Sequence, residues 1–238
     1  MKILLIGYGK MGKFIEQIAL QRGHEIVGRI SSSSPDKLNQ FNGQNTDVAI
    51  EFTQPEAAFE HVSYCAKNNI AVVCGTTGWY ARRPEAEAIV NQHNGAFFHA
   101  SNFSIGVNLF FHLNKLAAQV FEKYPVYDVR MEEIHHTEKK DAPSGTAITL
   151  AEGILQNFSR KNQWTLNEGA QDTDLIIKAL REPHVPGTHT VSYESAIDTI
   201  TLTHTAHSRE GFATGAVLAA EWLKGREGVF GMAEMLGF

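Results

Sequence analysis

The sequence has few of the residues that build disulfide frameworks, zinc sites or membrane spans. Only two of its 238 residues are cysteines, Cys65 and Cys74, which excludes a disulfide framework and a cysteine-rich zinc site and favours a reducing compartment. No apolar run approaches the roughly 18 residues of a membrane-spanning helix, and the N-terminus lacks the pattern of a signal peptide. We therefore expect a cytoplasmic protein with no membrane partner and no bound metal.

An excess of basic residues is also missing. The chain carries 21 Lys and Arg against 26 Asp and Glu, a formal net charge of −5, and its pI is near 6.1. Such a surface repels a polyanion on average, so no nucleic-acid partner is expected. What remains is an ordinary globular composition, 43% hydrophobic and 20% charged, over a length that suits one large or two modest domains.

Strand-like and helix-like segments alternate through the first half of the chain. Short apolar runs, typical of strands buried on both faces, are separated by runs with helical periodicity. This order predicts right-handed crossovers and a parallel, Rossmann-like sheet. Residues 31–45 are too polar and broken for a full crossover helix, so we expect a reduced adenosine pocket. The predicted strands cover residues 2–7, 25–30, 47–52, 70–74 and 96–100, and the predicted helices cover residues 13–22, 55–68 and 84–94.

A glycine-rich turn follows the first predicted strand and precedes the first predicted helix, and it fits the pattern G-x-G-x-x-G. The first glycine would make a tight turn, the second would let a pyrophosphate approach the backbone, and the third would let the helix pack on the strand. A glycine-rich turn without a ligand is the alternative, but the context favours a dinucleotide. The predicted contacts are Gly7, Tyr8, Gly9, Lys10, Met11 and Gly12.

The end of the second predicted strand bears on the choice of nucleotide. Many dinucleotide sites have an acidic residue there, which accepts hydrogen bonds from the adenosine ribose. This chain has Ser31 in a run of serines, with Arg29 before it and Lys37 after it. Without a carboxylate, serines and a cation can bind a 2′-phosphate. We therefore predict NADPH and/or NADH as the cofactor, with NADPH at least as good as NADH. The alternative is that the serine run is only a solvated loop.

Two short polar segments, residues 75–77 and 100–103, follow the fourth and fifth predicted strands. Because parallel strands end at the same edge of a sheet, both segments should lie at that edge. Ligands of open α/β sheets bind outside the carboxyl ends of the strands, so we predict nucleotide contacts from both segments. The ring of Phe103 either faces the nicotinamide or simply packs in the core. The predicted contacts are Gly75, Thr76, Thr77, Ala100, Ser101, Asn102 and Phe103.

The second half of the chain has a different pattern. Residues 105–124, 147–158 and 211–225 are typical of amphipathic helices, and residues 126–136, 185–195 and 199–206 of strands with partial alternation. We predict an α/β protein with a Rossmann-like nucleotide domain plus an α+β substrate domain whose open sheet is mixed or antiparallel. The nucleotide domain would comprise residues 1–104 and 209–238, and the inserted substrate domain residues 105–208.

The densest chemical signal is the segment EIHHTEKKDAPSGT at residues 133–146, in which two histidines and two lysines precede a Pro-Ser-Gly-Thr turn. Imidazoles exchange protons near neutral pH, ammonium groups supply positive charge, and the N–H groups of a helix start bind anions. Together these features predict a pocket that binds carboxylates and transfers a proton.

Other polar residues receive a plainer interpretation. Ser144 is expected to cap a helix rather than act as a nucleophile, because no His/Asp pairing is evident. Lys140 is expected to be solvated. Five histidines have no comparable support as site residues, namely His112, His184, His189, His204 and His207.

The chain resembles the dihydrodipicolinate reductase (4-hydroxy-tetrahydrodipicolinate reductase) family over nearly its whole length. The signature His-His-x-x-Lys-x-Asp-Ala-Pro-Ser-Gly-Thr is very specific to that family. The resemblance implies NAD(P)H-dependent reduction of 4-hydroxy-tetrahydrodipicolinate to tetrahydrodipicolinate in diaminopimelate and lysine biosynthesis. The segments that carry it are GYGKMG at 7–12, EFTQP at 51–55, CGTTG at 74–78, SNFSIGVN at 101–108, EIHHTEKKDAPSGTA at 133–147 and SREGFATGAV at 208–217.

The resemblance also implies residue roles. His135 and Lys139 would be catalytic, His135 in proton transfer and Lys139 as proton donor. His136, Gly145 and Thr146 would bind the substrate, the last two through a carboxylate. The loop at residues 7–12 and the segments after the later strands would contact the cofactor. The substrate domain would also serve oligomerisation, because members of the family assemble as homotetramers through its sheet.

Thr188 departs from the family, which commonly has an acidic residue there in a Gly-Glu-His turn. Two alternatives remain open: a related nicotinamide enzyme, such as an amino-acid or aspartate-semialdehyde-type dehydrogenase, and a non-enzymatic nucleotide sensor. The sensor alternative leaves the dense His/Lys cluster unexplained. The reductase interpretation requires that this cluster face a reduced nicotinamide across a cleft between the domains.

Overall fold

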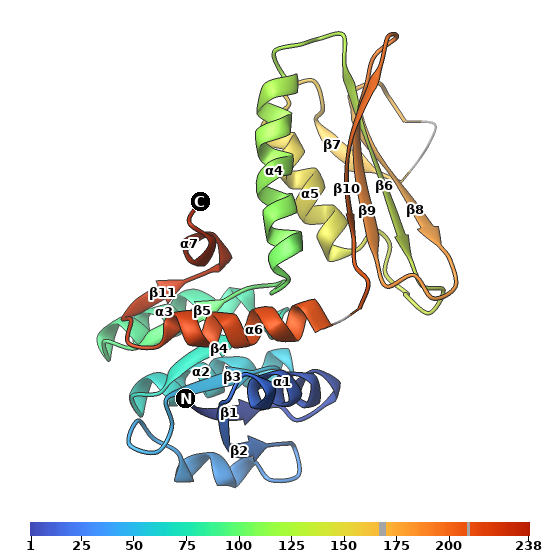
Figure 1. Ribbon diagram of the computed structural model, residues 1–238. Helices are drawn as coiled ribbons and strands as arrows, with labels where there is room; N and C mark the ends of the chain where they lie inside the picture. The colour runs from blue at the N-terminus through green and yellow to red at the C-terminus, as the bar shows by residue number, and fades with distance from the viewer. Residues whose placement is uncertain (167–169, 209) are drawn as a thin grey trace. The chain divides into compact units, whose positions relative to one another are not determined.

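The computed structural model describes residues 1–166, 170–208 and 210–238. The chain forms two compact units, one comprising Met1–Ile105 with Glu210–Phe238 and the other comprising Gly106–Arg209. We call them unit 1 and unit 2. Figure 1 labels their helices and strands. Within the described residues no helix has both the length and the apolar character needed to cross a membrane.

Unit 1 contains a six-stranded sheet in which every pair of neighbours is parallel, with the order β11-β5-β4-β3-β1-β2. This confirms the predicted parallel, Rossmann-like sheet. The short strand β11 at its edge was not predicted. The strands are β1 (Lys2–Ile6), β2 (Glu25–Ile30), β3 (Val48–Glu51), β4 (Ala71–Cys74), β5 (Ala96–His99) and β11 (Gly228–Phe230).

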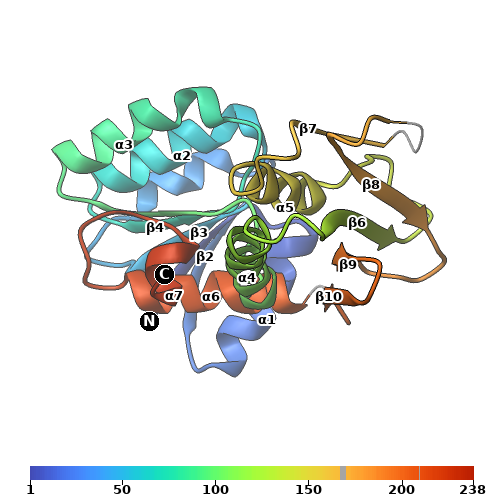
Figure 2. The ribbon, with the colours of Figure 1, turned by 90° about the horizontal axis from the view of Figure 1, so that it is seen from above.

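Helices cover both faces of this sheet, and Figure 2 shows α2 and α3 on one face and α1 and α6 on the other. Only a 3-10 helix, Pro35–Gln40, lies between β2 and β3, in agreement with the predicted lack of a full crossover helix. The helices of unit 1 are α1 (Lys10–Gln21), α2 (Pro55–Lys67), α3 (Arg83–Gln92), α6 (Glu210–Leu223) and α7 (Met232–Leu236), with a second 3-10 helix at Tyr80–Arg82.

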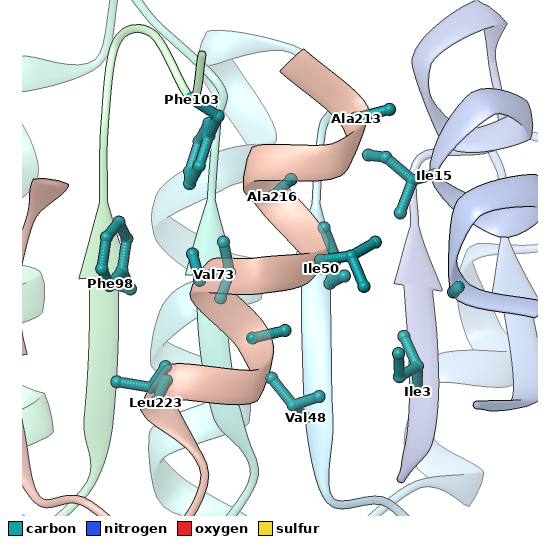
Figure 3. Close-up of a cluster of buried hydrophobic side chains, with 14 of the residues drawn as sticks. Ile3, Ile15, Val48, Ile50, Val73, Phe98, Phe103, Ala213, Ala216 and Leu223 are labelled. Atoms are coloured by element: carbon teal, nitrogen blue, oxygen red, sulfur yellow. The ribbon is translucent and has the colours of Figure 1, made fainter. Parts of the chain in front are cut away.

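Helix α6 packs closely on the sheet because its inward face carries small residues. Figure 3 shows Ala213 and Ala216 of α6 in one buried cluster with strand side chains such as Ile50 and Phe98. A Cβ on Gly215 would lie 1.8 Å from the carbonyl oxygen of Phe103, so only glycine fits there. Helix α6 therefore completes the core of unit 1 and supports the loop that follows β5.

Unit 2 contains a five-stranded sheet with the order β10-β9-β6-β8-β7. The sheet is mixed, since β6 pairs antiparallel with β9 and parallel with β8, and β8 pairs parallel with β7. This agrees with the predicted mixed or antiparallel sheet, although β7 and β8 were not recognised in the sequence. The strands are β6 (Asp128–His135), β7 (Gln163–Thr165), β8 (Asp174–Arg181), β9 (Thr188–Glu194) and β10 (Thr199–Thr205).

Two helices, α4 (Ile105–Phe121) and α5 (Gly145–Leu155), pack with this sheet around one hydrophobic cluster. The strands alternate, so that one face of the sheet is buried in the cluster and the other carries polar and charged residues. The buried Asn114 of α4 donates to the carbonyl oxygen of Leu150 in α5 at 2.9 Å, which fixes the two helices against each other. The covered face of the sheet is also the face that carries the candidate catalytic residues.

Candidate functional site

Unit 1 has a cavity of about 530 Å³ at the carboxyl ends of β1, β3 and β4. In the sheet order, β1 lies between β2 and β3, so the chain leaves β1 and β3 in different directions at this point. Such a switch in strand order is where open α/β sheets bind dinucleotides. The lining residues are Gly9, Lys10, Met11, Gly12, Phe52, Thr53, Gln54, Pro55, Gly75, Thr76 and Thr77.

The three glycines of the predicted turn fit a dinucleotide, each for a different reason. Gly7 has φ +97°, and a Cβ there would lie 2.0 Å from the carbonyl oxygen of Phe52. A Cβ on Gly12 would lie 2.3 Å from the carbonyl oxygen of Gly7, so glycine lets α1 approach the strand. Gly9 instead has open space where its Cβ would be and lines the cavity. A phosphate can therefore approach the backbone at Gly9.

Two helix N-termini meet at this cavity. Gly9 caps α1 and Gln54 caps α2, and both residues line it. The unpaired N–H groups and the partial positive charge at the start of each helix favour an anion. The cavity therefore offers backbone donors to a pyrophosphate, together with the side chain of Lys10.

Seven of the predicted cofactor contacts line the cavity, and the others lie outside its lining: Gly7, Tyr8, Ser31 and Ala100 to Phe103. The Phe103 side chain is 2% exposed and packs against the rings of Phe52 and Phe98, as Figure 3 shows for Phe98. The structure therefore supports core packing as the role of this ring, rather than contact with a nicotinamide. The loop around Phe103, without the contribution of its ring, remains a predicted cofactor contact.

The end of β2 carries serine hydroxyls and Arg29, whose guanidinium is already paired with a carboxylate. The Ser31 hydroxyl lies 2.8 Å from that of Ser33. Arg29 donates to Glu16 at 2.9 Å, and its guanidinium lies 5.6 Å from the centre of the Tyr8 ring. Part of the charge that we expected to be available for a 2′-phosphate is thus neutralised by a carboxylate on α1.

The sequence analysis missed residues 52–55 as part of this cavity. They follow β3 at the same sheet edge as Gly75 after β4, so the rule applied to Gly75 would have found them. Below them the fully buried Glu51 accepts from the Cys74 thiol at 3.0 Å and lies 3.3 Å from Nδ1 of His61. Burial raises the pKa of Glu51, but hydrogen bonds from His61, Cys74 and Thr53 bring it below the usual value.

Unit 2 gathers ionisable side chains at one end of its covered sheet face. Along β6 the covered residues are first apolar and then ionisable, ending with Glu133 and His135. In the register of the sheet Glu133 is opposite His189 of β9, and His135 is opposite Arg181 of β8. Neighbouring strands therefore change from apolar to polar at the same level, although their residues are far apart in the sequence.

The Glu133 carboxylate is the centre of this cluster and is fully buried. Both of its oxygens accept from the backbone N–H of Ser144 at 3.1 Å. Nδ1 of His135 lies 3.5 Å away, Nε2 of His189 3.6 Å and the Arg181 guanidinium 3.6 Å. A buried charge needs such partners, because an unpaired one is costly.

The cluster shifts the proton affinities of its members. Burial raises the pKa of Glu133, but hydrogen bonds from His189 and Ser144 reduce it to about 2. Burial lowers the pKa of His135 to about 4; the Glu133 carboxylate opposes this, whereas His189, Lys139 and Arg181 add to it. At neutral pH Glu133 is therefore ionised and the His135 imidazole is neutral.

Lys139 lies in the loop after β6 and forms an ion pair with Asp141 at 2.8 Å. Arg181 supports this loop from β8, since it donates to the carbonyl oxygen of Asp141 at 2.6 Å and to that of Lys139 at 3.4 Å. Lys140 is exposed, as predicted. The loop thus presents one ammonium held close to the cluster and one in solvent.

The N-terminus of α5 lies beside the cluster. Ser144 caps the helix, as predicted, because its hydroxyl accepts from the N–H of Ala147 at 3.1 Å. Nε2 of His189 lies 3.1 Å from the same hydroxyl. Gly145 is exposed, and within the described residues no hydrogen bond to its N–H or to that of Thr146 is found. These two amides are free to bind an anion.

His136 and His135, adjacent in the sequence, differ in their surroundings. His135 is buried in the cluster, whereas His136 follows the end of β6 and is half-buried. The alternation of side chains along a strand explains the difference. Of these two adjacent histidines, His135 belongs to the Glu133 cluster and His136 does not.

Sequence reasoning missed three members of this cluster, namely Glu133, Arg181 and His189, and His189 was wrongly grouped with histidines that lack support. A signal was available in β9, where His189 continues the alternation of Val191 and Tyr193 on the covered face. Donor atoms of Glu133, His135 and His189 lie within 4.8 Å of one another. Arg181 and Lys139 disfavour a dication there, so we interpret the group as an acid–base cluster.

A parallel α/β unit with a glycine turn beside a cavity, joined to a second unit with a buried acid–base cluster, is typical of two-domain nicotinamide-dependent oxidoreductases. Family models for "Dihydrodipicolinate reductase, N-terminus" and "Dihydrodipicolinate reductase, C-terminus" match residues 1–103 and 106–236. The chain belongs to the dihydrodipicolinate reductase family.

Individual relatives agree with this assignment. A 4-hydroxy-tetrahydrodipicolinate reductase from Christiangramia forsetii is 49% identical over 237 residues, covering 99% of this chain and 98% of the relative. The structure of a dipicolinate-bound dihydrodipicolinate reductase from Paenisporosarcina sp. TG-14 matches with a TM-score of 0.82 and 25% identity, over 98% of this chain and 99% of that chain.

The dehydrogenase alternative is supported by the fold alone. Aspartate semialdehyde dehydrogenase II from Vibrio cholerae matches with a TM-score of 0.52 and 13% identity, over 93% of this chain and 97% of that chain. Family membership therefore favours the reductase over the related dehydrogenases.

Proposed function

We propose that the protein reduces 4-hydroxy-tetrahydrodipicolinate to tetrahydrodipicolinate with NAD(P)H, in diaminopimelate and lysine biosynthesis. In this reaction the ring takes up a hydride and a proton and loses its hydroxyl as water. The observation that carries the proposal is the arrangement in unit 2, where His135 and the start of α5 lie around one buried carboxylate and Lys139 lies in the loop between them. That arrangement suits a small dicarboxylate that must be protonated.

Each residue of unit 2 has a role in the proposal. Lys139 donates the proton, since an ammonium is charged at neutral pH, and the neutral His135 relays protons beside it. The free N–H groups of Gly145 and Thr146 bind one substrate carboxylate. His136 contacts the substrate from the end of β6. A bound dianion would also draw Lys139 away from Asp141, with which it now pairs at 2.8 Å.

The bound nucleotide supplies the hydride, and unit 1 binds and orients it. The N–H groups at the starts of α1 and α2 receive the pyrophosphate beside Gly9. Gly75, Thr76 and Thr77 bind further along the cavity, and the Thr76 hydroxyl is fixed by the N–H of Thr53 at 2.7 Å. The remaining predicted contacts, Tyr8, Ser31 and the loop at residues 100–103, would complete the site.

NADPH is proposed to be at least as good a cofactor as NADH. The support is the group of serine hydroxyls at the end of β2, where a carboxylate would repel a 2′-phosphate. Ser31→Asp places such a charge there and should raise the KM for NADPH by about tenfold while changing that for NADH little. A wild-type kcat/KM that favours NADH by about tenfold would contradict the proposal.

A coupled assay tests the activity itself. The substrate is generated by purified dihydrodipicolinate synthase, and the loss of NADPH or NADH absorbance is followed with and without the protein. Reduction that depends on the synthase product supports the proposal. Oxidation of aspartate or of its semialdehyde, with no turnover of the synthase product, would favour the alternative dehydrogenases.

Two further expectations go with this function. We propose a homotetramer assembled through the sheet of unit 2, whose uncovered face carries paired charges such as Arg130–Glu194 and Lys178–Glu132. We also propose a cytoplasmic location, with which the two free, buried cysteines are compatible. Light scattering on the purified chain tests the first expectation, and fractionation of cells tests the second.

A further inference from the structure

The fully buried Glu133 is not among the residues given a role in the proposed reaction, yet its carboxylate touches both parts of the site in unit 2. One side of the carboxylate holds the start of α5 through the N–H of Ser144 at 3.1 Å. The other side faces the imidazole of His135, with Nδ1 3.5 Å from the nearer oxygen. A carboxylate in this position can accept but not donate a hydrogen bond, since the partners keep it ionised.

The two ring nitrogens of His135 have different surroundings. Nδ1 is buried, has no hydrogen-bond partner among the described residues, and lies 3.5 Å from the nearer carboxylate oxygen of Glu133. Nε2 lies on the other edge of the ring and faces Gly187. A Cβ added to Gly187 would lie 3.1 Å from Nε2. A neutral imidazole carries one proton, and the group facing one nitrogen decides which nitrogen holds it.

We propose that Glu133 is a positioning residue that holds the His135 proton on Nδ1, so that Nε2 is the nitrogen that exchanges a proton during turnover. The 3.5 Å separation is long for a hydrogen bond, and catalytic contacts of this kind commonly shorten when substrate binds. The kinetic part of this inference rests on the proposed function, whereas the tautomer is a property of the protein alone.

Titratable groups from every neighbouring strand act on the same ring. Glu133 approaches it from β6, His189 from β9 and Arg181 from β8, and Lys139 acts from the following loop. Glu133 is the one group among these that favours the protonated imidazole; the others oppose it. Removing its charge should therefore leave both tautomers accessible and make His135 harder to protonate.

The direct test reads the tautomer without any activity assay. Wild-type protein labelled with ¹⁵N in its histidines is measured by long-range ¹H–¹⁵N NMR at neutral pH, and His135 is assigned from the signals lost in His135→Gln. The proposal expects a protonated Nδ1 and an unprotonated Nε2. A proton on Nε2 in the wild-type protein would overturn it, whether or not the protein has reductase activity.

Glu133→Gln, compared with Glu132→Gln, tests the role of the charge. The amide oxygen of Gln can still accept from Ser144, so the turn before α5 is kept. Glu132 is the next residue on β6, half-exposed and 3.4 Å from Lys178, and its substitution removes the same charge from the opposite face. We expect Glu133→Gln to populate both tautomers, and Glu132→Gln to keep the Nδ1–H tautomer alone.

The same pair gives the kinetic readout. Glu133→Gln should lower kcat about tenfold or more and move the acidic limb of the kcat/KM profile to lower pH, with KM changed less than about threefold. Glu132→Gln should leave the acidic limb at its wild-type pH. An unchanged tautomer and pH profile in Glu133→Gln would refute the role of Glu133. Absence of turnover in the wild type would instead refute the proposed function, and the NMR result would still decide the tautomer.

Discussion

The candidate site of unit 1 and that of unit 2 are built from different materials. In unit 1, main-chain N–H groups, glycines and hydroxyls surround a cavity, so the backbone would make most of the proposed nucleotide contacts. In unit 2, ionisable side chains from three strands meet around Glu133. The first arrangement is made of three short segments, each of which follows a strand directly, and the second depends on strand register. Substitutions should therefore change affinity in unit 1 and proton transfer in unit 2.

The largest effect is expected at Lys139. Lys139→Ala removes the proposed proton donor and should lower kcat by about two orders of magnitude or more, the usual contribution of a general acid. Lys140→Ala is the control, because that neighbouring lysine is exposed. The measurement is the coupled assay at saturating nucleotide. An unchanged rate in Lys139→Ala would remove this residue from the mechanism.

The acid stability of the two units can be compared through one buried histidine in each, His99 in unit 1 and His135 in unit 2. Burial lowers the pKa of both His99 in unit 1 and His135 in unit 2 to about 4. The unfolded chain therefore binds more protons between pH 6.5 and 4, so both histidines contribute stability above pH 6.5 that is lost as the pH falls toward 4.

The loss of unfolding free energy from each histidine is at most about 3 kcal/mol. Urea unfolding at a series of pH values in this window measures it. We expect His99→Gln and His135→Gln each to flatten the dependence of the unfolding free energy on pH. A variant that keeps the slope of the wild type would show that its histidine is protonated equally in both states.

Substitutions of Gly9 and Gly12 should have different effects in unit 1, the first on nucleotide binding and the second on stability. Gly9→Ala adds a methyl group into open space lining the cavity, so it should weaken NADPH binding by about tenfold and leave thermal stability almost unchanged. Gly12→Ala places a Cβ 2.3 Å from the Gly7 carbonyl oxygen and should destabilise the unit by about 1–3 kcal/mol. Fluorescence titration and urea unfolding measure the two effects. Equal loss of stability in both variants would contradict the distinction.

The smallest effect is expected at Ser144. Ser144→Ala removes the cap of α5 and should cost about 1 kcal/mol of unfolding free energy. Because the cap orients the N–H groups of Gly145 and Thr146, the KM for the substrate should rise more than kcat falls. Thr149→Ala is the control, since its hydroxyl bonds only to a carbonyl within the same helix. A fall in kcat alone would place Ser144 in proton transfer instead.

The nucleotide-binding unit was largely predictable because its signals are local. A continuous apolar run marks β1, and the glycine spacing after it fixes the turn into α1. The contribution of residues 52–55 was missed, although they obey the same rule. In unit 2 the motif at residues 133–146 located the candidate site, but β7 and β8 were not recognised. A short apolar run such as that of β8 does not by itself distinguish a strand from a buried helix.

The class of fold, the glycine turn and the His/Lys segment before a helix start could be read from the amino-acid order, because each is encoded by residues within a few positions of one another. That His189 and Arg181 join Glu133 and His135, and that Phe103 packs in the core, became known from the folded chain. The physical reason is that strand pairing and burial link residues distant in the chain. Their pKa values and hydrogen bonds exist only after that register forms.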